Sequence, residues 1–318
     1  MKKIVIFGGG SGLSQLLKGI KLFPLEITAV VSVADNGGST GRLRKELNIP
    51  AVGDITKVMV AMSDTDQDMV DLLNYRFTKS KTLGNHSVKN LLLNALIDLQ
   101  GSFDKAIPVL AKMLDLKGTI LPLTEDNVDL IGITKDGKKV YGEEMVTKSA
   151  SQIKRLEYNK KINVNPKVMK AVRDADLIIF SSGSLLTSII PHLLDENLVA
   201  EINKAKAKKM YICNLFTQPG ETDKFSVADH LDLLETYLGK DSIDVVIANN
   251  TVMNSTLVAK YSTQEQKDPV LLDMNELENR KVQIIADRLF KIEENYYRHD
   301  SLKTAYLIFA YLMGDKRA

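Results

Sequence analysis

The 318-residue sequence contains no tryptophan, a single cysteine and only 6% aromatic residues. A lone Cys213 excludes an internal disulfide and a zinc site built on several cysteines. It lies in the apolar run 210–213, where a small core side chain is expected rather than a nucleophile. The scarcity of aromatic residues argues against the stacking platforms that bind single-stranded nucleic acid.

The sequence also lacks a charge excess and a long apolar run. It has 42 Lys and Arg residues against 40 Asp and Glu residues, with both signs mixed along the chain. No nucleic-acid partner is expected, because such proteins concentrate basic charge on one face. No segment approaches the ~20 apolar residues of a membrane span, and the apolar run at 4–7 is too short for a signal peptide. A cytoplasmic protein without a membrane span is expected.

Strands and helices alternate along the chain. Residues 3–7 and 27–33 have the composition of buried strands, and glycines followed by leucines at helical spacing lie between them. This order predicts the opening of a right-handed βαβ unit. A mostly helical stretch follows at 54–116. Further helices are predicted at 166–175, 227–238 and 301–313, and strands at 177–180, 210–215 and 245–248. We expect a Rossmann-like α/β fold, with a parallel sheet flanked by helices in one domain over residues 1–318.

A small β excursion is predicted around residues 118–142. The apolar pattern there changes to a strand-like period, and Asp136-Gly137 is typical of a two-residue hairpin turn. We expect the excursion to pack beside the main sheet or to support a homodimer contact.

Four strand ends carry loops rich in small polar residues, at 8–12, 35–41, 181–184 and 214–223. Ligands of open parallel sheets bind at the carboxyl ends of the strands, where glycines permit close approach and helix N-termini offer N–H groups to anions. The candidate nucleotide-binding residues are Gly9, Gly10, Ser11, Gly12, Asp35, Asn36, Gly37, Gly38, Ser39, Arg42, His86, Asn90, Gly183, Ser184, Asn214, Thr217, Gln218 and Arg298.

Several of these candidates have an alternative, structural interpretation. Asp35 either caps its own turn or contacts the ligand. The position of Arg42 after the second glycine loop favours phosphate pairing over a solvated surface role. His86 and Asn90 share one face of a helix near its N-terminus, and Arg298 precedes the last helix, within reach of a diphosphate.

A dinucleotide-binding dehydrogenase is not favoured. The first loop has Gly8-x-Gly10, but Leu13 stands where the third glycine of that fingerprint belongs. No metal-ligand spacing is present and no cofactor is required. Magnesium that bridges a bound diphosphate to Asp35 or Asp54 remains an open alternative.

Together these blocks resemble a known family. The runs Phe7-Gly8-Gly9-Gly10-Ser11-Gly12, Asp35-Asn36-Gly37-Gly38-Ser39-Thr40-Gly41-Arg42 and Thr217-Gln218-Pro219-Gly220-Glu221-Thr222-Asp223 are similar to those of the YvcK-type gluconeogenesis factors. This group is related to CofD, the 2-phospho-L-lactate transferase of coenzyme F420 synthesis. The resemblance extends from residue 4 to about residue 300.

The resemblance implies a protein that binds a nucleoside diphosphate derivative. In the gluconeogenesis-factor branch that ligand is a UDP-sugar, and no catalytic activity is settled. The leading hypothesis is therefore a UDP-sugar-binding regulator of growth on gluconeogenic carbon sources and of cell shape, acting on an unidentified partner protein. The alternative is a CofD-like transferase in which Asp35 or Asp54 positions the acceptor hydroxyl.

The sequence departs from the family pattern at several positions. Asn85 and Lys89 replace the glycines of a Gly-His-x-x-Gly-Asn block, and Ser181 replaces the first glycine of a Gly-Pro-Gly-Ser block. Thr56-Lys57 stands where Arg-Asn is common. Because glycines let a backbone approach phosphates closely, these replacements are expected to reshape the pocket.

Overall fold

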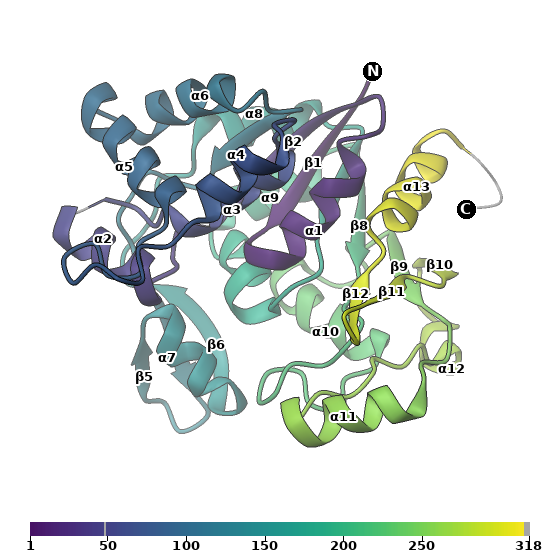
Figure 1. Ribbon diagram of the computed structural model, residues 1–318. Helices are drawn as coiled ribbons and strands as arrows, with labels where there is room; N and C mark the ends of the chain where they lie inside the picture. The colour runs from purple at the N-terminus through teal and green to yellow at the C-terminus, as the bar shows by residue number, and fades with distance from the viewer. Residues whose placement is uncertain (48, 315–318) are drawn as a thin grey trace.

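The computed structural model describes residues 1–47 and 49–314 (Figure 1). Its centre is a sheet of seven strands in the order β10-β9-β8-β7-β1-β2-β3, in which every neighbouring pair is parallel. These strands are β1 (Lys2–Gly8), β2 (Leu25–Val31), β3 (Thr119–Pro122), β7 (Leu177–Phe180), β8 (Lys208–Ile212), β9 (Val245–Asn249) and β10 (Gln283–Asp287). The predicted Rossmann-like α/β fold is confirmed.

The order of the strands reverses between β1 and β7. From β1 the chain adds β2 and β3 on one side, and it then returns to add β7, β8, β9 and β10 on the other. Loops that leave neighbouring strands at such a switch point diverge to opposite faces of the sheet and leave a crevice between them. The fold therefore places the strand-end loops after β1 and β7 at the expected ligand position.

Helices cover both faces of the sheet (Figure 1). Side chains of β1 alternate between two cores: Ile4 and Ile6 belong to one hydrophobic cluster, and Val5 and Phe7 to the other. The helices are α1 (Gly10–Ile20), α2 (Gly38–Leu47), α3 (Gly53–Met62), α4 (Gln67–Asn74), α5 (Val88–Gln100), α6 (Phe103–Met113), α7 (Glu143–Lys148), α8 (Pro166–Asp174), α9 (Glu196–Lys204), α10 (Val227–Leu238), α11 (Ser255–Glu265), α12 (Met274–Leu277) and α13 (Ser301–Leu312).

The β excursion lies later in the chain than predicted. Residues 119–122 form β3, the edge strand of the main sheet, rather than part of the excursion. The excursion itself is an antiparallel sheet of β4 (Leu130–Thr134), β5 (Lys139–Tyr141) and β6 (Ile153–Tyr158). A hairpin turn that contains Asp136-Gly137 joins β4 to β5, but its loop has three residues, 135–137, rather than the predicted two, because the backbone N–H of Thr134 donates to Lys138. The pairing of β3 with β2 is not visible in a local pattern, because parallel partners are distant in sequence.

The loop predicted at residues 35–41, the second glycine block, is shorter in the structure. Helix α2 begins at Gly38, so Ser39, Thr40 and Gly41 form its first turn. Gly41 is required there, because a Cβ atom would lie 1.9 Å from the carbonyl oxygen of Asn36. The block therefore combines a turn at 35–37 with the start of a helix.

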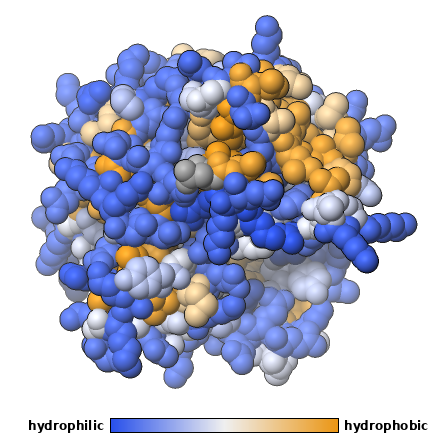
Figure 2. Space-filling model, turned by 90° about the vertical axis from the view of Figure 1, so that its left-hand side faces the viewer, coloured by the Kyte–Doolittle hydropathy of each residue, from blue (hydrophilic) through white to orange (hydrophobic). Residues whose placement is uncertain are grey.

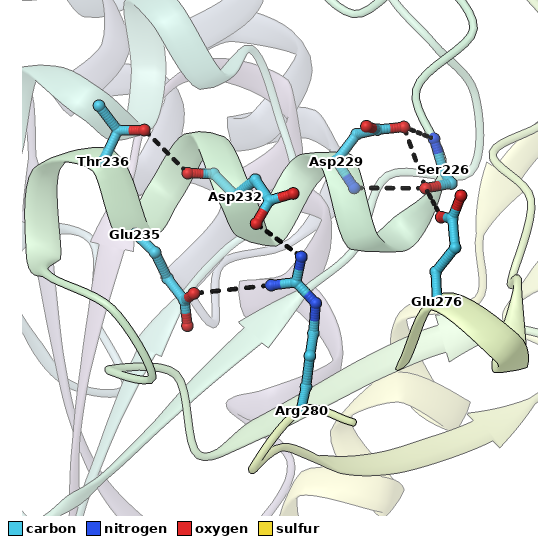
Figure 3. Close-up of polar contacts among 7 residues, drawn as sticks. All are labelled: Ser226, Asp229, Asp232, Glu235, Thr236, Glu276 and Arg280. Carbon is cyan, nitrogen blue, oxygen red and sulfur yellow. Dashed lines mark hydrogen bonds and ion pairs between the residues drawn. The ribbon is translucent and has the colours of Figure 1, made fainter. Parts of the chain in front are cut away.

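The C-terminal third is fixed by helix caps and one arginine. Ser226 and Asp229 form a capping box at the start of α10 (Figure 3). Arg280, which precedes β10, donates to Asp232 at 2.6 Å and lies 3.6 Å from Glu235 of the same helix. An antiparallel hairpin of β11 (Phe290–Glu293) and β12 (Tyr296–His299) then leads to α13, whose N-cap Asp300 accepts from the backbone N–H of Lys303.

Three short helical turns complete the fold: η1 (Ala150–Gln152), the π-helical η2 (Leu185–Ile189) and η3 (Ile190–Leu193). Figure 2 views the side of the molecule at the left of Figure 1 and shows a hydrophilic face with a hydrophobic area in its upper half. Across residues 1–47 and 49–314, no helix is long and apolar enough to cross a membrane.

Candidate functional site

A cleft of about 630 Å³ lies at the switch point of the sheet. It is bounded by the start of α1, by the loops after β7 and β8, by α11 and by the β11–β12 hairpin. It brings together seven residues predicted from the sequence, namely Ser11, Gly12, Gly183, Asn214, Thr217, Gln218 and Arg298. Segments that are far apart in the sequence thus form one cleft.

Gly12 allows two segments of the chain, rather than a ligand, to approach each other closely. A Cβ atom at this position would lie 1.9 Å from the carbonyl oxygen of Ser182. Only a glycine therefore lets α1 pack directly against the loop after β7. Gly183, which follows Ser182 in this loop, has a φ of +144°, a conformation that also favours glycine.

Two predicted ligand residues instead hold the loops in place. The side chain of Asn214 accepts from the backbone N–H of Gly183 at 2.8 Å and donates to its carbonyl oxygen at 2.9 Å. Thr217 Oγ1 accepts from the backbone N–H of Asp268 at 3.0 Å. The Oε1 atom of Gln218, in contrast, is buried and has no partner among the described residues. Gln218 therefore retains a buried acceptor for a ligand donor.

Ser184 is a structural residue outside the cleft lining. It caps the π-helical turn η2 by accepting from the backbone N–H of Thr187, and it donates to Glu221 at 2.8 Å. Glu221 also accepts from the backbone N–H groups of Leu185 and Leu186. Burial raises the pKa of this carboxyl group. The Thr-Gln-Pro-Gly-Glu-Thr-Asp block thus anchors the loop after β7 through its glutamate.

Aromatic rings form one wall of the cleft, although the sequence has few of them. Phe216 stacks on Tyr261 with ring centroids 4.4 Å apart, and the backbone N–H of Tyr297 donates to the Tyr261 hydroxyl at 2.8 Å. Tyr296 is 37% exposed, and Lys260 Nζ lies 4.8 Å from the centre of its ring. A partly exposed ring beside a polar cleft suits the stacking of a base once a cation over the ring moves aside.

Charged and polar groups lie next to this wall. The guanidinium carbon of Arg298 is 5.4 Å from the centre of the Tyr296 ring, and Lys267 pairs with Glu265 at 2.7 Å. Both ring nitrogens of His299 are buried without a partner in the described chain, and burial lowers its pKa to about 4. His299 is therefore a neutral imidazole at neutral pH.

The sequence reasoning missed several cleft residues: Gln15, Tyr261, Glu265, Lys267, Tyr296, Tyr297 and His299. The run Tyr296-Tyr297-Arg298-His299 carried a usable signal, since two aromatic residues precede the predicted arginine. Tyr261 carried none, because α11 reaches the cleft only through tertiary packing.

The other predicted residues form a second group around α2, which we call the α2 corner (residues 35–42 and 84–90). Of the residues the structure describes there, none lines the cleft. Asp35 accepts from the backbone N–H of Gly37 at 2.9 Å, which is the turn-capping alternative. Asn36 Oδ1 accepts from the backbone N–H of Glu144 at 3.0 Å and so holds α7.

Several other members of the α2 corner also have internal partners, whereas Ser87 Oγ is buried without one among the described residues. Ser39 Oγ lies 2.7 Å from His86 Nδ1, and Arg42 donates to the carbonyl oxygen of Gly84. Thr56 donates to Asn90 Oδ1 at 2.7 Å. His86 has a lowered pKa because of its burial and the charge of Arg42. These side chains bond to other groups of the chain and do not line the cleft, and their contact with a nucleotide stays a prediction.

Asp54 lies between the two groups, against the start of α1. A Cβ atom at Gly9 would be 2.9 Å from its carboxylate, and the backbone N–H of Gly10 donates to it. Burial and the charge of Asp35 raise the pKa of Asp54 to about 6, although Lys57 opposes the shift. The carboxylate thus occupies the N-terminus of α1, the place expected for a ligand anion.

The sequence left open a magnesium ion that bridges a bound diphosphate to Asp35 or Asp54, and both carboxylates lie in this area. In the described chain, no group of three or more His, Cys, Asp or Glu side chains could hold a metal ion. Asp35 and Asp54 fit the ion only as a pair of carboxylates, so oxygens of a diphosphate or water would have to complete its coordination.

One departure from the family pattern preserves the local geometry. Asn85, which replaces a glycine, has a φ of +64°. Asparagine tolerates this left-handed conformation better than most residues. The backbone of the turn before α5 is thus kept without the glycine.

Comparisons with known proteins identify the family. The family model described as 2-phospho-L-lactate transferase CofD matches residues 4–290. The gluconeogenesis factor of Bacillus subtilis (strain 168) is 41% identical over 307 residues, covering 96% of each chain. That of Halalkalibacterium halodurans is 38% identical over 306 residues, covering 96% of this chain and 94% of the relative.

A solved structure agrees with these relatives. The crystal structure of a protein from Bacillus halodurans superposes with a TM-score of 0.92 at 38% identity, covering 97% of this chain and 99% of that one. Both the sequence matches and the structural match span nearly the whole chain. The protein therefore belongs to the CofD family, on the branch whose members are called gluconeogenesis factors.

Proposed function

We propose that this gluconeogenesis factor binds a UDP-sugar, or another nucleoside diphosphate derivative, in the cleft at the switch point. The observation that supports a nucleotide is the pairing of an exposed ring, Tyr296, with a guanidinium, Arg298, in one cleft. The ring offers a stacking face for a base, and the guanidinium matches the geometry of phosphate oxygens. Ser11 adds a hydroxyl donor, and Gln218 adds an unpaired buried acceptor.

In this proposal the protein is a cytoplasmic regulator of growth on gluconeogenic carbon sources and of cell shape. The ligand would contact α1, the loop after β8 and the β11–β12 hairpin at once. Binding would therefore link these three elements across the cleft. A partner protein, or a second copy in a homodimer, would read that change at the surface.

The first test is calorimetric titration with UDP-N-acetylglucosamine, UDP-glucose, GDP and NAD, with and without magnesium. A UDP-sugar dissociation constant in the micromolar range, roughly −8 kcal/mol, is expected, with no heat from NAD. Tighter binding of GDP than of UDP-sugars would contradict the uridine ligand. Absence of binding by every nucleotide would contradict the proposal as a whole.

A matched pair of variants assigns the binding to the cleft. Tyr296→Ala removes the stacking ring, and base stacking is worth about 1–3 kcal/mol, so the affinity should fall about 5- to 150-fold. Tyr141→Ala removes an exposed tyrosine of β5, which is 61% exposed and outside the cleft. Equal affinities of the two variants would place the nucleotide elsewhere.

A transferase is the second candidate, and Asp54 gives a specific reason to test it. A carboxyl group with a pKa of about 6 at the start of α1 suits the acceptance of a proton from a hydroxyl acceptor. Phosphorus NMR would follow a guanosine-linked phospholactate, or a UDP-sugar, mixed with hydroxyl acceptors. Nucleotide release that is lost in Asp54→Asn supports the transferase, and an unchanged donor supports the regulator.

A further inference from the structure

A second hollow of about 250 Å³ adjoins the cleft. It lies among α1, α3, α5 and the end of α4, and Ser11 and Gln15 of α1 line both hollows. A molecule seated in the cleft therefore needs to extend only past these two side chains to enter the second hollow. We call the second hollow the lysine pocket, because Lys18, Lys57 and Lys89 line it.

The lysine pocket carries positive charge that the fold balances only in part. Three separate helices, α1, α3 and α5, each contribute one lysine, and none of its described lining residues is acidic. Lys89 Nζ donates to the neutral amide of Asn74 at 2.5 Å. Lys57 Nζ forms an ion pair with Asp54 Oδ1 at 3.7 Å, and Asp54 lies outside the pocket lining. The Asp54 carboxylate therefore offsets part of the positive charge.

This arrangement has an energetic cost that a ligand would relieve. Burial, together with the charges of Lys57 and Arg76, lowers the pKa of Lys89 to about 8. Like charges gathered in a partly buried hollow repel one another and lose hydration. An anion in the pocket would reverse both effects.

We propose that the lysine pocket binds a second anionic group, a carboxylate or a phosphate, next to the nucleotide in the cleft. This inference rests on the proposed function and narrows its ligand class. The anion belongs either to the nucleotide-linked sugar, as in a sugar acid, or to a separate anionic molecule bound beside it. In both cases Ser11 and Gln15 form the boundary between the nucleotide and the anion.

Two titrations distinguish these sources. The first compares UDP-glucuronate with UDP-glucose, which differ in one carboxylate, at low ionic strength. An anion on the sugar gives about tenfold tighter binding of UDP-glucuronate. The second titrates inorganic phosphate into the protein saturated with UDP-glucose, and a separate anion gives saturable binding there. Absence of both effects would overturn the lysine pocket.

Three variants test the residues in the same titrations. Lys57→Gln and Lys89→Gln should each abolish the preference for UDP-glucuronate, or the phosphate binding, while UDP-glucose affinity stays within about twofold. Lys138→Gln removes a lysine that is 81% exposed on the excursion and should change neither measurement. Lys18→Gln, at an exposed position on α1, gives a further variant if a buried substitution impairs folding. A preference that survives in Lys18→Gln, Lys57→Gln and Lys89→Gln would overturn the assignment.

The result also separates this inference from the function on which it rests. If UDP-glucose does not bind, the nucleotide proposal fails by itself. The lysine pocket is then tested on the free protein with inorganic phosphate alone. Phosphate binding that disappears in Lys57→Gln and Lys89→Gln retains the anion site, and unchanged or absent phosphate binding overturns it.

Discussion

The cleft at the switch point and the α2 corner both begin at a glycine-rich strand end, but their polar groups are used differently. In the cleft, Gln218 Oε1 and both ring nitrogens of His299 are buried without a partner in the described chain. In the α2 corner, Asp35, Ser39 and Arg42 all bond to groups within the corner, and Ser87 Oγ is the atom buried there without a partner among the described residues. A glycine-serine motif therefore indicates a tight strand-to-helix connection, whereas only the surrounding chain decides whether a ligand is needed.

The topology explains this difference. The loops after β1 and β7 flank the switch point and diverge, so a crevice remains between them. The loop after β2 lies on the other side of β1, where the segment before α5 and helix α7 bond to its residues. The same kind of sequence block thus lines the cleft in one place and holds neighbouring elements together in the other.

The largest expected effect concerns two glycines, one from each region. Gly12→Ala should destabilise the protein by about 3 kcal/mol, because its Cβ would overlap the backbone of Ser182. Gly38→Ala in the α2 corner meets open space, and only its φ of +46° is unfavourable, at roughly 1 kcal/mol. Chemical denaturation of both variants measures the difference. Equal losses of stability would remove the evidence for tight packing at the cleft.

The next effect concerns Asp54, between the two regions. Its pKa of about 6 in the folded protein exceeds the ordinary value of 3.8, so ionisation of this group costs folding free energy. The cost is absent below about pH 4 and complete above about pH 7, and a shift of one pKa unit is worth about 1.4 kcal/mol. Asp54→Asn should therefore be more stable than the parent at pH 7, by up to about 3 kcal/mol, and similar to it at pH 4. Unfolding curves at both pH values check this, and a variant that loses stability at pH 7 would contradict it.

A pair of arginines tests the functional side of the comparison. Arg298→Gln should weaken UDP-sugar binding about 10- to 100-fold without a change in melting temperature, because its guanidinium lies in the cleft. Arg42→Gln removes the bond to Gly84 and should lower stability by about 0.5–1 kcal/mol with binding unchanged. If Arg42→Gln alone weakened binding, the ligand would lie in the α2 corner.

Most of the sheet could be predicted from the sequence. Continuous apolar runs such as 177–180 indicate strands buried on both faces, and the glycine turn after β1 indicates the βαβ unit. Strand β10 was not predicted, because its apolar segment between Gln283 and Asp287 is only three residues long. The sequence could not assign β3 to the main sheet, because its parallel partner β2 lies far away in the chain and a local sequence pattern does not reveal the pairing.

The site could be predicted only in part, for a related reason. Strand-end motifs predicted Ser11, Gly12 and Gly183, and the position before the last helix predicted Arg298; all four line one cleft. They did not distinguish side chains that face a ligand from side chains that hold the fold, as for Asn214. Tyr261 was missed because the approach of α11 to the β11–β12 hairpin is a tertiary contact. Local sequence therefore predicts where loops begin, and packing decides what their side chains contact.

The smallest expected effect isolates one buried bond of the α2 corner. Ser39→Ala removes the hydroxyl that lies 2.7 Å from His86 Nδ1 and leaves that buried nitrogen without this partner. The expected loss is about 1 kcal/mol, with UDP-sugar affinity unchanged. Ser11→Ala is the matched serine in the cleft, where affinity should fall a few-fold at constant stability. Denaturation and calorimetry on both variants give four values. The comparison holds only if Ser39→Ala loses stability alone and Ser11→Ala loses affinity alone. A serine that contributed to both the fold and the ligand site would lower stability and affinity together.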